Sequence, residues 1–291
     1  MYELIKIAEQ SYYIDCPVKI GVYDTGSGVY LIDSGGDKDA GRRVRKILDE
    51  RGWKLLGILN THSHADHIGG NQYLQRQTGC RVFAPGMEVY FTRSPVLEPS
   101  LLYGGCPPKP LRHKFLMAQP SEAEDIGSPH FPADVQVVPL PGHSPEQVGY
   151  LLPDGTAFIA DSVAGVAMDK YSFPYIYDVG SYLESLNKLK AMEAKTYVPS
   201  HAPACTDITP AAEANILHTR WLGGQVLRLC TEPRTFEEML KLAFDEQGME
   251  LTMQQYVLVG STLKSFLAWH LDAGRVAAEC EDNRLLWRSI V

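Results

Sequence analysis

Seven histidine and aspartate side chains in this sequence could together bind metal ions. Four of them form one short motif, His62-x-His64-x-Asp66-His67, directly after an apolar stretch that is predicted to be a strand. In an extended segment, side chains two residues apart project to the same side, so His62 and His64 can bind one ion. Asp66 and His67 lie one step further along the turn and can reach an adjacent ion.

Three residues distant in the sequence complete a candidate binuclear site. Each of them follows a predicted strand, and loops at one edge of a sheet can converge in space. A carboxylate can bind one ion through each oxygen, so Asp161 is predicted to bridge the two ions. The expected first site is His62, His64 and His143, the expected second site is Asp66, His67 and His201, and Asp161 and a water-derived hydroxide lie between them.

The order of these motifs resembles that of the metallo-β-lactamase superfamily. The matching residues are the His62–His67 motif, Gly142-His143, Asp161 and Ser200-His201, and the resemblance covers about residues 10 to 205. It implies an α/β fold, a four-layer αββα sandwich of two mixed sheets with the metal site along one edge. The chain is more similar to the glyoxalase II and lactonase branch than to the others. His64 replaces the Glu of the oxygen-reducing di-iron branch, and Asp161 stands where several β-lactamases have Cys.

The ligand set contains imidazoles and carboxylates and no thiolate. Such a set suits two divalent ions; zinc is expected, because hydrolysis needs a Lewis acid without redox chemistry, and iron or manganese would also fit. A metal can lower the pKa of bound water to about 7, so a bridging hydroxide could attack an ester, thioester or lactone carbonyl. Asp66 is expected to bind metal and, as a secondary hypothesis, to act catalytically by passing a proton onward.

Three alternatives remain open. A phosphodiesterase or nuclease could use the same metal core, but it would need a basic channel that the acidic balance of the chain argues against. An iron-dependent sulfur dioxygenase resembles the same pattern but uses fewer of these residues as metal contacts. A binding or regulatory protein with a vestigial site would retain no metal.

The elements that must position these residues alternate between strands and helices. Apolar runs predict strands at 14–22, 28–32, 55–59, 81–84, 135–140, 149–152, 156–160 and 197–199. A helix is expected after Ser34-Gly35-Gly36, with Val44 and Leu48 on its apolar face, and another over 71–77. Ser181-Tyr182-Leu183-Glu184 is interpreted as a capping box that begins a further helix.

The chain of 291 residues has room for one large and one smaller domain. Residues 1–207 are expected to form the catalytic domain, and the proline-rich stretch 92–130 is interpreted as an insertion near the active site, with a solvent-facing excursion as the alternative. Residues 208–291 are predicted to be mostly helical, over 211–229, 235–244 and 253–273, with a small two-stranded wing. This segment resembles the winged-helix-like module of some hydrolases in the superfamily, and we interpret it as a structural cap or dimer element that walls the pocket.

Charge and composition limit the partners. The chain has 27 Lys and Arg against 35 Asp and Glu, a net charge of −8, and acidic chains are poor general binders of nucleic acid or anionic membrane. No apolar run approaches the roughly 18 residues of a membrane span. Residues 1–10 contain no recognisable secretory signal, and the six cysteines are scattered, so we expect reduced thiols and a cytoplasmic location. The expected partner is a small-molecule substrate. A homodimer is left open.

A few polar residues have two readings each. Asp33 ends a strand and either orients a metal ligand or forms a turn before the following helix. The basic run Arg112-His113-Lys114 either receives an anionic group of the substrate or is a solvated turn. One of Tyr171, Tyr175 and Tyr177 is a candidate to hold the substrate carbonyl, as in related lactonases, and otherwise they pack around the pocket mouth.

Overall fold

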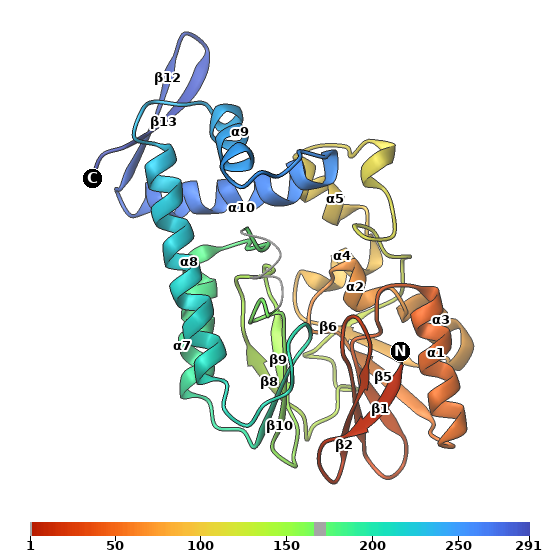
Figure 1. Cartoon of the computed structure of the whole chain (residues 1–291). Helices are drawn as coiled ribbons and strands as arrows, with labels where there is room; N and C mark the ends of the chain where they lie inside the picture. The colour runs from red at the N-terminus through yellow and green to blue at the C-terminus, as the bar shows by residue number, and fades with distance from the viewer. Residues whose placement is uncertain (1, 166–172) are drawn as a thin grey trace.

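A computed structural model describes residues 2–165 and 173–291, so Tyr171 lies outside the described residues. Two β-sheets pack face to face, and helices cover both outer faces (Figure 1). This arrangement confirms the expected four-layer αββα sandwich. A helical C-terminal segment, in blue, crosses one end of the sandwich.

The first sheet has seven strands in chain order. The strands from β1 to β4 form an antiparallel meander, and those from β4 to β7 run parallel. The expected single strand over 14–22 is wrong, because Pro17 interrupts the stretch and lacks the N–H that a ladder needs. The strands are β1 (Glu3–Lys6), β2 (Ser11–Asp15), β3 (Ile20–Asp24), β4 (Val29–Ile32), β5 (Leu55–Leu59), β6 (Arg81–Ala84) and β7 (Glu124–Asp125).

The second sheet has four strands in the order β11-β10-β9-β8. The pair β10 and β11 is parallel, and the other neighbours are antiparallel. The turn at Asp154-Gly155 joins β9 to β10, and Gly155 has the positive φ of 90° that such a turn requires. The expected strands from 28–32 onward are confirmed to within one residue at each end. The strands are β8 (Gln136–Pro139), β9 (Val148–Leu151), β10 (Thr156–Ala160) and β11 (Thr196–Pro199).

Paired helices cover each outer face. The first sheet packs against α1 (Lys38–Glu50) and α3 (Asn71–Thr78), and the second against α7 (Val179–Ala191) and α8 (Thr209–Leu229). The expected capping box at 181–184 is wrong: α7 begins one turn earlier, and its N-cap is Asp178, whose side chain accepts from the Ser181 N–H at 3.0 Å. An N-cap carboxylate satisfies an otherwise unpaired donor, and this places Ser181 inside the first turn.

Three apolar layers stabilise the sandwich. The middle layer, between the two sheets, contains Tyr23, Leu59 and Phe83 from one sheet and Tyr150 and Phe158 from the other, all buried. Burying such side chains stabilises the fold by about 1.5–3 kcal/mol each. Because this layer holds the sheets face to face, the loops that follow β5, β8, β10 and β11 meet along one edge.

Short helices and the C-terminal segment lie at that edge. The short helices are α2 (Ala65–Ile68), α4 (Glu88–Arg93), α5 (Leu97–Tyr103) and the 3-10 turn Lys109–Leu111. The C-terminal helices α9 (Phe236–Glu246) and α10 (Met253–Asp272) confirm the predicted helical character, and β12 (Val276–Glu281) pairs with β13 (Arg284–Ser289) as a hairpin. One face of α10 packs against α5, α7 and α8. In the described part of the chain, no helix is both long and apolar enough to cross a membrane.

Candidate metal centre

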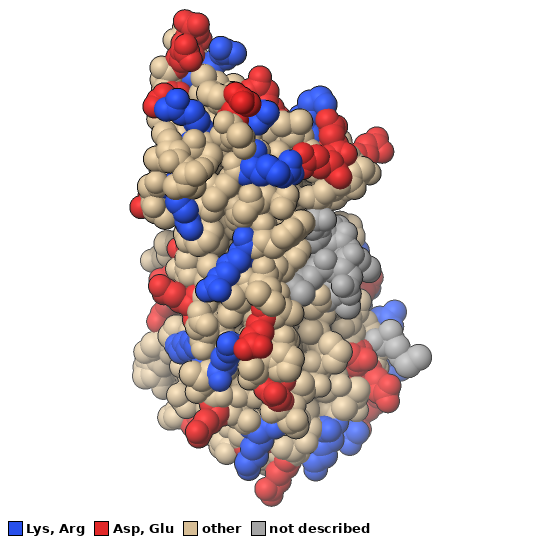
Figure 2. All heavy atoms as spheres, turned by 60° about the vertical axis from the view of Figure 1, so that its left-hand side comes forward, with Lys and Arg blue, Asp and Glu red and all other residues tan. Residues whose placement is uncertain are grey.

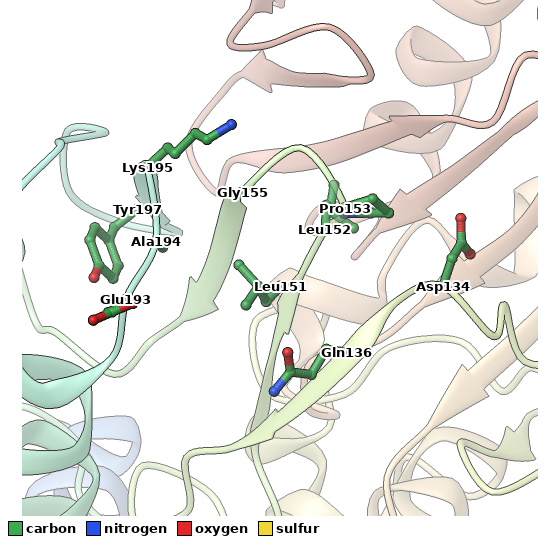
Figure 3. A pocket seen from close by; sticks show the side chains of 10 residues that line it. All are labelled: Asp134, Gln136, Leu151, Leu152, Pro153, Gly155, Glu193, Ala194, Lys195 and Tyr197. Carbon is green, nitrogen blue, oxygen red and sulfur yellow. The ribbon is translucent and has the colours of Figure 1, made fainter.

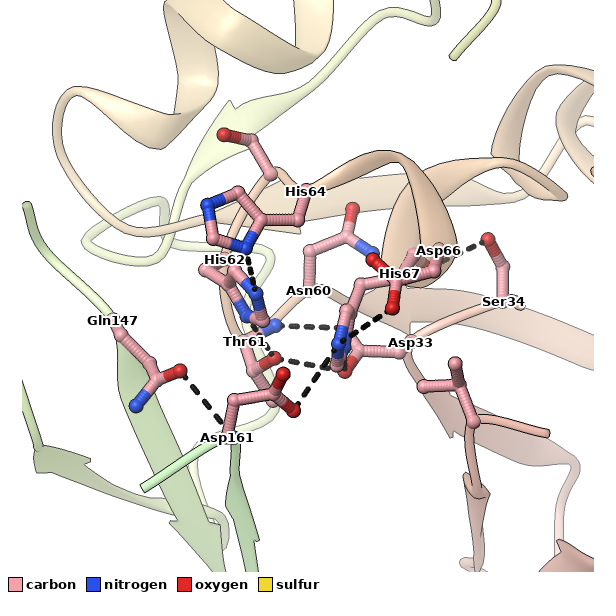
Figure 4. A network of polar contacts seen from close by, with 12 residues as sticks. Asp33, Ser34, Asn60, Thr61, His62, His64, Asp66, His67, Gln147 and Asp161 are labelled. Carbon is pink, nitrogen blue, oxygen red and sulfur yellow. Dashed lines mark hydrogen bonds and ion pairs between the residues drawn. The ribbon is translucent and has the colours of Figure 1, made fainter. Parts of the chain in front are cut away.

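The seven predicted ligand side chains lie together at the edge of the sandwich. The motif His62–His67 leaves the end of β5 and continues into α2, so four of the side chains come from one turn. His143 follows β8, Asp161 follows β10 directly, and His201 follows β11. Figure 4 shows the motif residues beside Asp161, with Asp33 next to His67.

The first group is a triangle of imidazole nitrogens. His64 Nδ1 lies 3.0 Å from His62 Nε2 and 3.0 Å from His143 Nε2. Nitrogen ligands of a tetrahedral zinc ion, each at about 2.0–2.1 Å, lie about 3.3 Å from one another. The spacing of these nitrogens is therefore close to what one shared cation would need.

The second group consists of Asp66, His67 and His201. The Asp66 Oδ2 atom lies 3.5 Å from His201 Nε2 and 3.9 Å from His67 Nε2. Asp161 touches both groups, because its Oδ1 is 3.2 Å from His67 Nε2 while its Oδ2 is 3.2 Å from His201 Nε2 and 3.5 Å from His143 Nε2. This is the position that a bridging carboxylate would occupy.

Two buried atoms test whether these residues fit metal ions. His67 Nε2 and Asp161 Oδ1 are buried, and neither has a hydrogen-bond partner of acceptable geometry. A buried polar atom left unpaired costs about 1–3 kcal/mol. A cation bound between them would satisfy both, so the donor set fits the divalent ions that the family implies.

The outward-facing nitrogens of four histidines each face a partner. His67 Nδ1 lies 2.7 Å from Asp33 Oδ2, so Asp33 contacts a predicted ligand directly. The remaining contacts are His62 Nδ1 to Thr61 Oγ1 at 3.0 Å, His143 Nδ1 to the Tyr175 carbonyl at 3.1 Å, and His64 Nε2 to Glu98 Oε1 at 3.5 Å. Such partners orient a ligating imidazole and select its tautomer.

The histidines of the two groups differ in pKa, because burial dominates in the first group and a neighbouring carboxylate in the second. Burial lowers the pKa of His62, and it lowers the pKa of both His64 and His143 to about 4. Asp161 raises the pKa of His201 to about 10. At neutral pH the first group is therefore unprotonated and able to bind a cation, whereas a cation at the second group must displace a proton.

A cavity of about 150 Å³ opens beside the cluster. Its walls include Glu98, Phe115 and Leu116 from the 92–130 stretch and Leu258 from α10. Tyr175 completes the lining, and its ring packs against those of His64 and His143 with centroids 5.3 and 5.6 Å apart. Any substrate that enters this cavity contacts both the proline-rich stretch and the C-terminal segment.

The other polar candidates from the sequence are not among the residues that line this cavity. Lys114 is ion-paired with Asp37 at 2.9 Å, and Arg112 donates to the Pro107 carbonyl, so both already have partners. Tyr177 is 38% exposed, and its carbonyl accepts from Ser265.

Sequence reasoning missed two buried carboxyl groups near the cluster, Glu88 and Glu98. Glu98 lies beside His64, and burial raises its pKa to about 8. Glu88 is hydrogen-bonded to residues next to the ligands. The signal that could have drawn attention to Glu98 is its place in the proline-rich 92–130 stretch, whereas Glu88 precedes that stretch and has no such signal.

A second hollow, of about 630 Å³, lies at the opposite end of the four-stranded sheet (Figure 3). Gly155, which lines it, precedes β10, whereas Asp161 follows β10, so the length of that strand separates the hollow from the cluster. It is lined by Asp134, Gln136, Leu151, Leu152, Pro153, Gly155, Glu193, Ala194, Lys195 and Tyr197, and by none of the seven predicted ligands.

Known proteins with similar sequences are hydrolases by name. Two proteins named hydroxyacylglutathione hydrolase match: one from Cereibacter sphaeroides is 28% identical over 180 residues, and one from Methylococcus capsulatus is 29% identical over 156 residues. The matches cover 62% and 53% of this chain, and 59% and 51% of the relatives. The chain thus spans between half and three fifths of the length of these relatives.

Solved structures with the same fold cover nearly the whole chain. A β-lactamase domain protein from Burkholderia ambifaria has a TM-score of 0.73 and 18% identity, covering 99% of this chain and 94% of that one. A metallo-β-lactamase family protein from Thermus thermophilus has a TM-score of 0.70 and 18% identity, covering 99% and 98%. The family model described as metallo-beta-lactamase superfamily matches residues 13–201, which include all seven predicted ligands. The chain belongs to the metallo-β-lactamase superfamily.

Proposed function

We propose that this protein is a binuclear metal-dependent hydrolase that cleaves a carbonyl ester bond, with a thioester as the first candidate and an ester or lactone as the others. The observation that carries the proposal is the pair of inward-facing donor groups joined by Asp161, in which two buried atoms lack a hydrogen-bond partner. The hydroxyacylglutathione hydrolase names of the relatives favour the thioester.

His62, His64 and His143 would hold the first ion, Asp66, His67 and His201 the second, and Asp161 both. Zinc is our proposed metal, because the donors are imidazoles and carboxylates and hydrolysis needs no redox change. When bound, such ions activate water as a nucleophile and polarise the substrate carbonyl.

The side chains around the cavity have their own proposed tasks. Asp66 is half-exposed at the cavity wall, so it can take a proton from the reacting centre and release it to solvent. The apolar groups of Phe115, Leu116 and Leu258 would hold the substrate against the cluster and exclude water from it.

We also propose a small-molecule substrate, a cytoplasmic location, and no nucleic-acid or membrane partner. The net charge of −8 supports the absence of nucleic acid and membrane, and Lys and Arg are interspersed with Asp and Glu on the described part of the face in Figure 2. The cytoplasmic location is proposed because the six cysteines are scattered through the sequence without the pattern of a disulfide scaffold. Boundaries at 1–207 and 208–291 are proposed because β11 ends at Pro199 and α8 begins at Thr209.

The test combines metal analysis with a substrate panel. The native protein is analysed for metal, stripped with a chelator, reloaded with zinc, and assayed on a hydroxyacyl-glutathione thioester, a lactone, an aryl ester and bis-p-nitrophenyl phosphate. We expect two ions per chain and thioester hydrolysis that chelation abolishes and zinc restores. Failure to bind metal, hydrolysis of the phosphodiester alone, or one iron per chain with oxygen uptake on a persulfide would each contradict the proposal.

A further inference from the structure

We propose that Glu88 is a positioning residue that joins the two loops carrying the first metal site and holds their three histidines at the spacing an ion requires. This proposal rests on the metal centre proposed above, and it does not depend on which substrate is cleaved. Glu88 itself touches none of the predicted ligand side chains through a hydrogen bond or ion pair in the described structure.

One carboxylate accepts from both loops at once. Glu88 is the first residue of α4 and is 1% exposed. Its Oε2 accepts from the Ser63 backbone N–H at 3.1 Å and from the Ser63 hydroxyl. Its Oε1 accepts from the Ser144 hydroxyl at 2.8 Å and from the Glu146 N–H at 3.3 Å.

The two serines flank the first-site histidines. Ser63 lies between His62 and His64 in the loop after β5, and Ser144 follows His143 in the loop after β8. These strands belong to different sheets, and the backbone hydrogen bond that connects the two regions, from the Val148 N–H to the Thr61 carbonyl at 3.0 Å, lies beyond the His143-Ser144 turn. Glu88 therefore provides a direct link between the backbone segments of all three histidines.

Stability alone does not account for this residue. Burying a carboxylate is costly even when hydrogen bonds compensate, and a close-packed apolar side chain avoids that cost. Among the described residues, Glu88 makes no ion pair with Lys or Arg, and its partners are hydroxyl and amide donors. These donors all belong to the two loops that carry the first-site histidines, so the contacts of Glu88 favour a positioning role.

The test measures metal affinity and ligand geometry rather than turnover. Glu88→Gln and Glu88→Ala are compared with the native protein by chelator competition for the first equivalent of zinc and by the visible spectrum of the cobalt(II) form. Gln keeps one acceptor oxygen but presents an amide donor to the other loop. We expect first-site affinity to fall about ten- to a hundredfold, with an altered cobalt spectrum, as for loss of other groups that orient metal ligands.

Glu124→Gln is the matched control, because Glu124 also accepts from a serine hydroxyl, that of Ser128, but does so on β7 next to Arg81. It should leave metal affinity and spectrum unchanged. A lower melting temperature in the Glu88 variants with native first-site affinity and spectrum would show a merely structural role and overturn the proposal. Absence of metal binding by the native protein would instead refute the proposed function.

Ser63→Ala and Ser144→Ala keep the proposal testable if the Glu88 variants fail to fold. Each removes one hydroxyl from the link and leaves the carboxylate in place. We expect each to weaken first-site binding only in part, because the Ser63 and Glu146 N–H groups still donate to Glu88. The double variant should weaken it by less than the product of the two single effects, since either loss already loosens the same link. Effects that multiply, or no effect from either serine, would contradict a link through Glu88.

Discussion

Asp33→Asn should weaken the second metal site while preserving the first. Asp33 is 1% exposed and accepts from the Thr61 N–H at 2.8 Å, from the Thr61 hydroxyl at 2.8 Å and from His67 Nδ1 at 2.7 Å. Asn has nearly the same shape and tolerates the positive φ of 63° at this position. Its amide nitrogen, however, would face either the Thr61 N–H or both His67 and the Thr61 hydroxyl, and an acceptor is needed at each place. The backbone N–H cannot turn away, so we expect the amide nitrogen to face His67.

The magnitude follows from the lost bond to His67. A hydrogen bond to a charged group contributes about 1.5–3 kcal/mol. Since 1.4 kcal/mol corresponds to about a factor of ten, the dissociation constant of the second ion should rise about ten- to a hundredfold. The free energy of unfolding of the metal-free protein should fall by a similar amount, about 1–3 kcal/mol, because a buried donor is left unpaired.

The assay titrates the metal-free protein with zinc in the presence of a chromophoric chelator and resolves the two binding steps. Urea unfolding of the same samples gives the stability change. Asp33→Glu is a poor control because its longer side chain would clash, so Asp24→Asn, at the half-buried end of β3, serves instead. The reasoning is refuted if Asp33→Asn loses stability but binds both ions as tightly as the native protein does.

Three further predictions address catalysis, the cavity and the fold. Asp66→Asn should cut turnover at least about a hundredfold and weaken the second ion, as measured by kcat and metal content; unchanged values for both would remove Asp66 from the mechanism. Leu258→Trp should fill part of the 150 Å³ cavity and raise KM by more than it lowers kcat, whereas exposed Leu271→Trp on the same helix should change neither. Hydrogen bonds from the Ala40 N–H and, next in size, from Lys114 lower the pKa of Asp37 below its usual 3.8. The ionised Asp37 therefore stabilises the folded state above pH 3.8, and this stabilisation is lost as the pH falls through the lower pKa of the folded state. Asp37→Ala should therefore cost about 1 kcal/mol in urea unfolding at about pH 7 and little near pH 2, and an equal cost at both would contradict this.

Much of the strand pattern could be predicted from local sequence signals, whereas the four-layer sandwich was expected from the family resemblance. The short apolar runs at 55–59 and 156–160 match β5 and β10 residue for residue. The helix with Val44 and Leu48 on its apolar face is α1, in which both side chains are buried. The start of α7 was misplaced because Asp178 and Ser181 are both favourable N-cap residues. In the structure Asp178 has the extended backbone conformation of an N-cap, and Ser181 is helical.

The residues around the cluster were harder to predict. The motif indicated that His62 and His64 share a side. The meeting of His143, Asp161 and His201 depends on how two sheets pack, and it was expected from their places after predicted strands together with the family resemblance. Glu88 and Glu98 were missed because a glutamate in a short helix is usually solvated, and only the packing of α4 and α5 against the site buries these two. Their burial depends on tertiary packing, so it cannot be predicted from the spacing of residues in the sequence.

The most direct test of the central claim is anomalous scattering at the zinc edge from crystals of the zinc-loaded protein. Our account predicts two peaks per chain, one among His62, His64 and His143 and the other among Asp66, His67 and His201, with Asp161 contacting both. No peak in this cluster, or zinc held only by residues elsewhere in the chain, would contradict it.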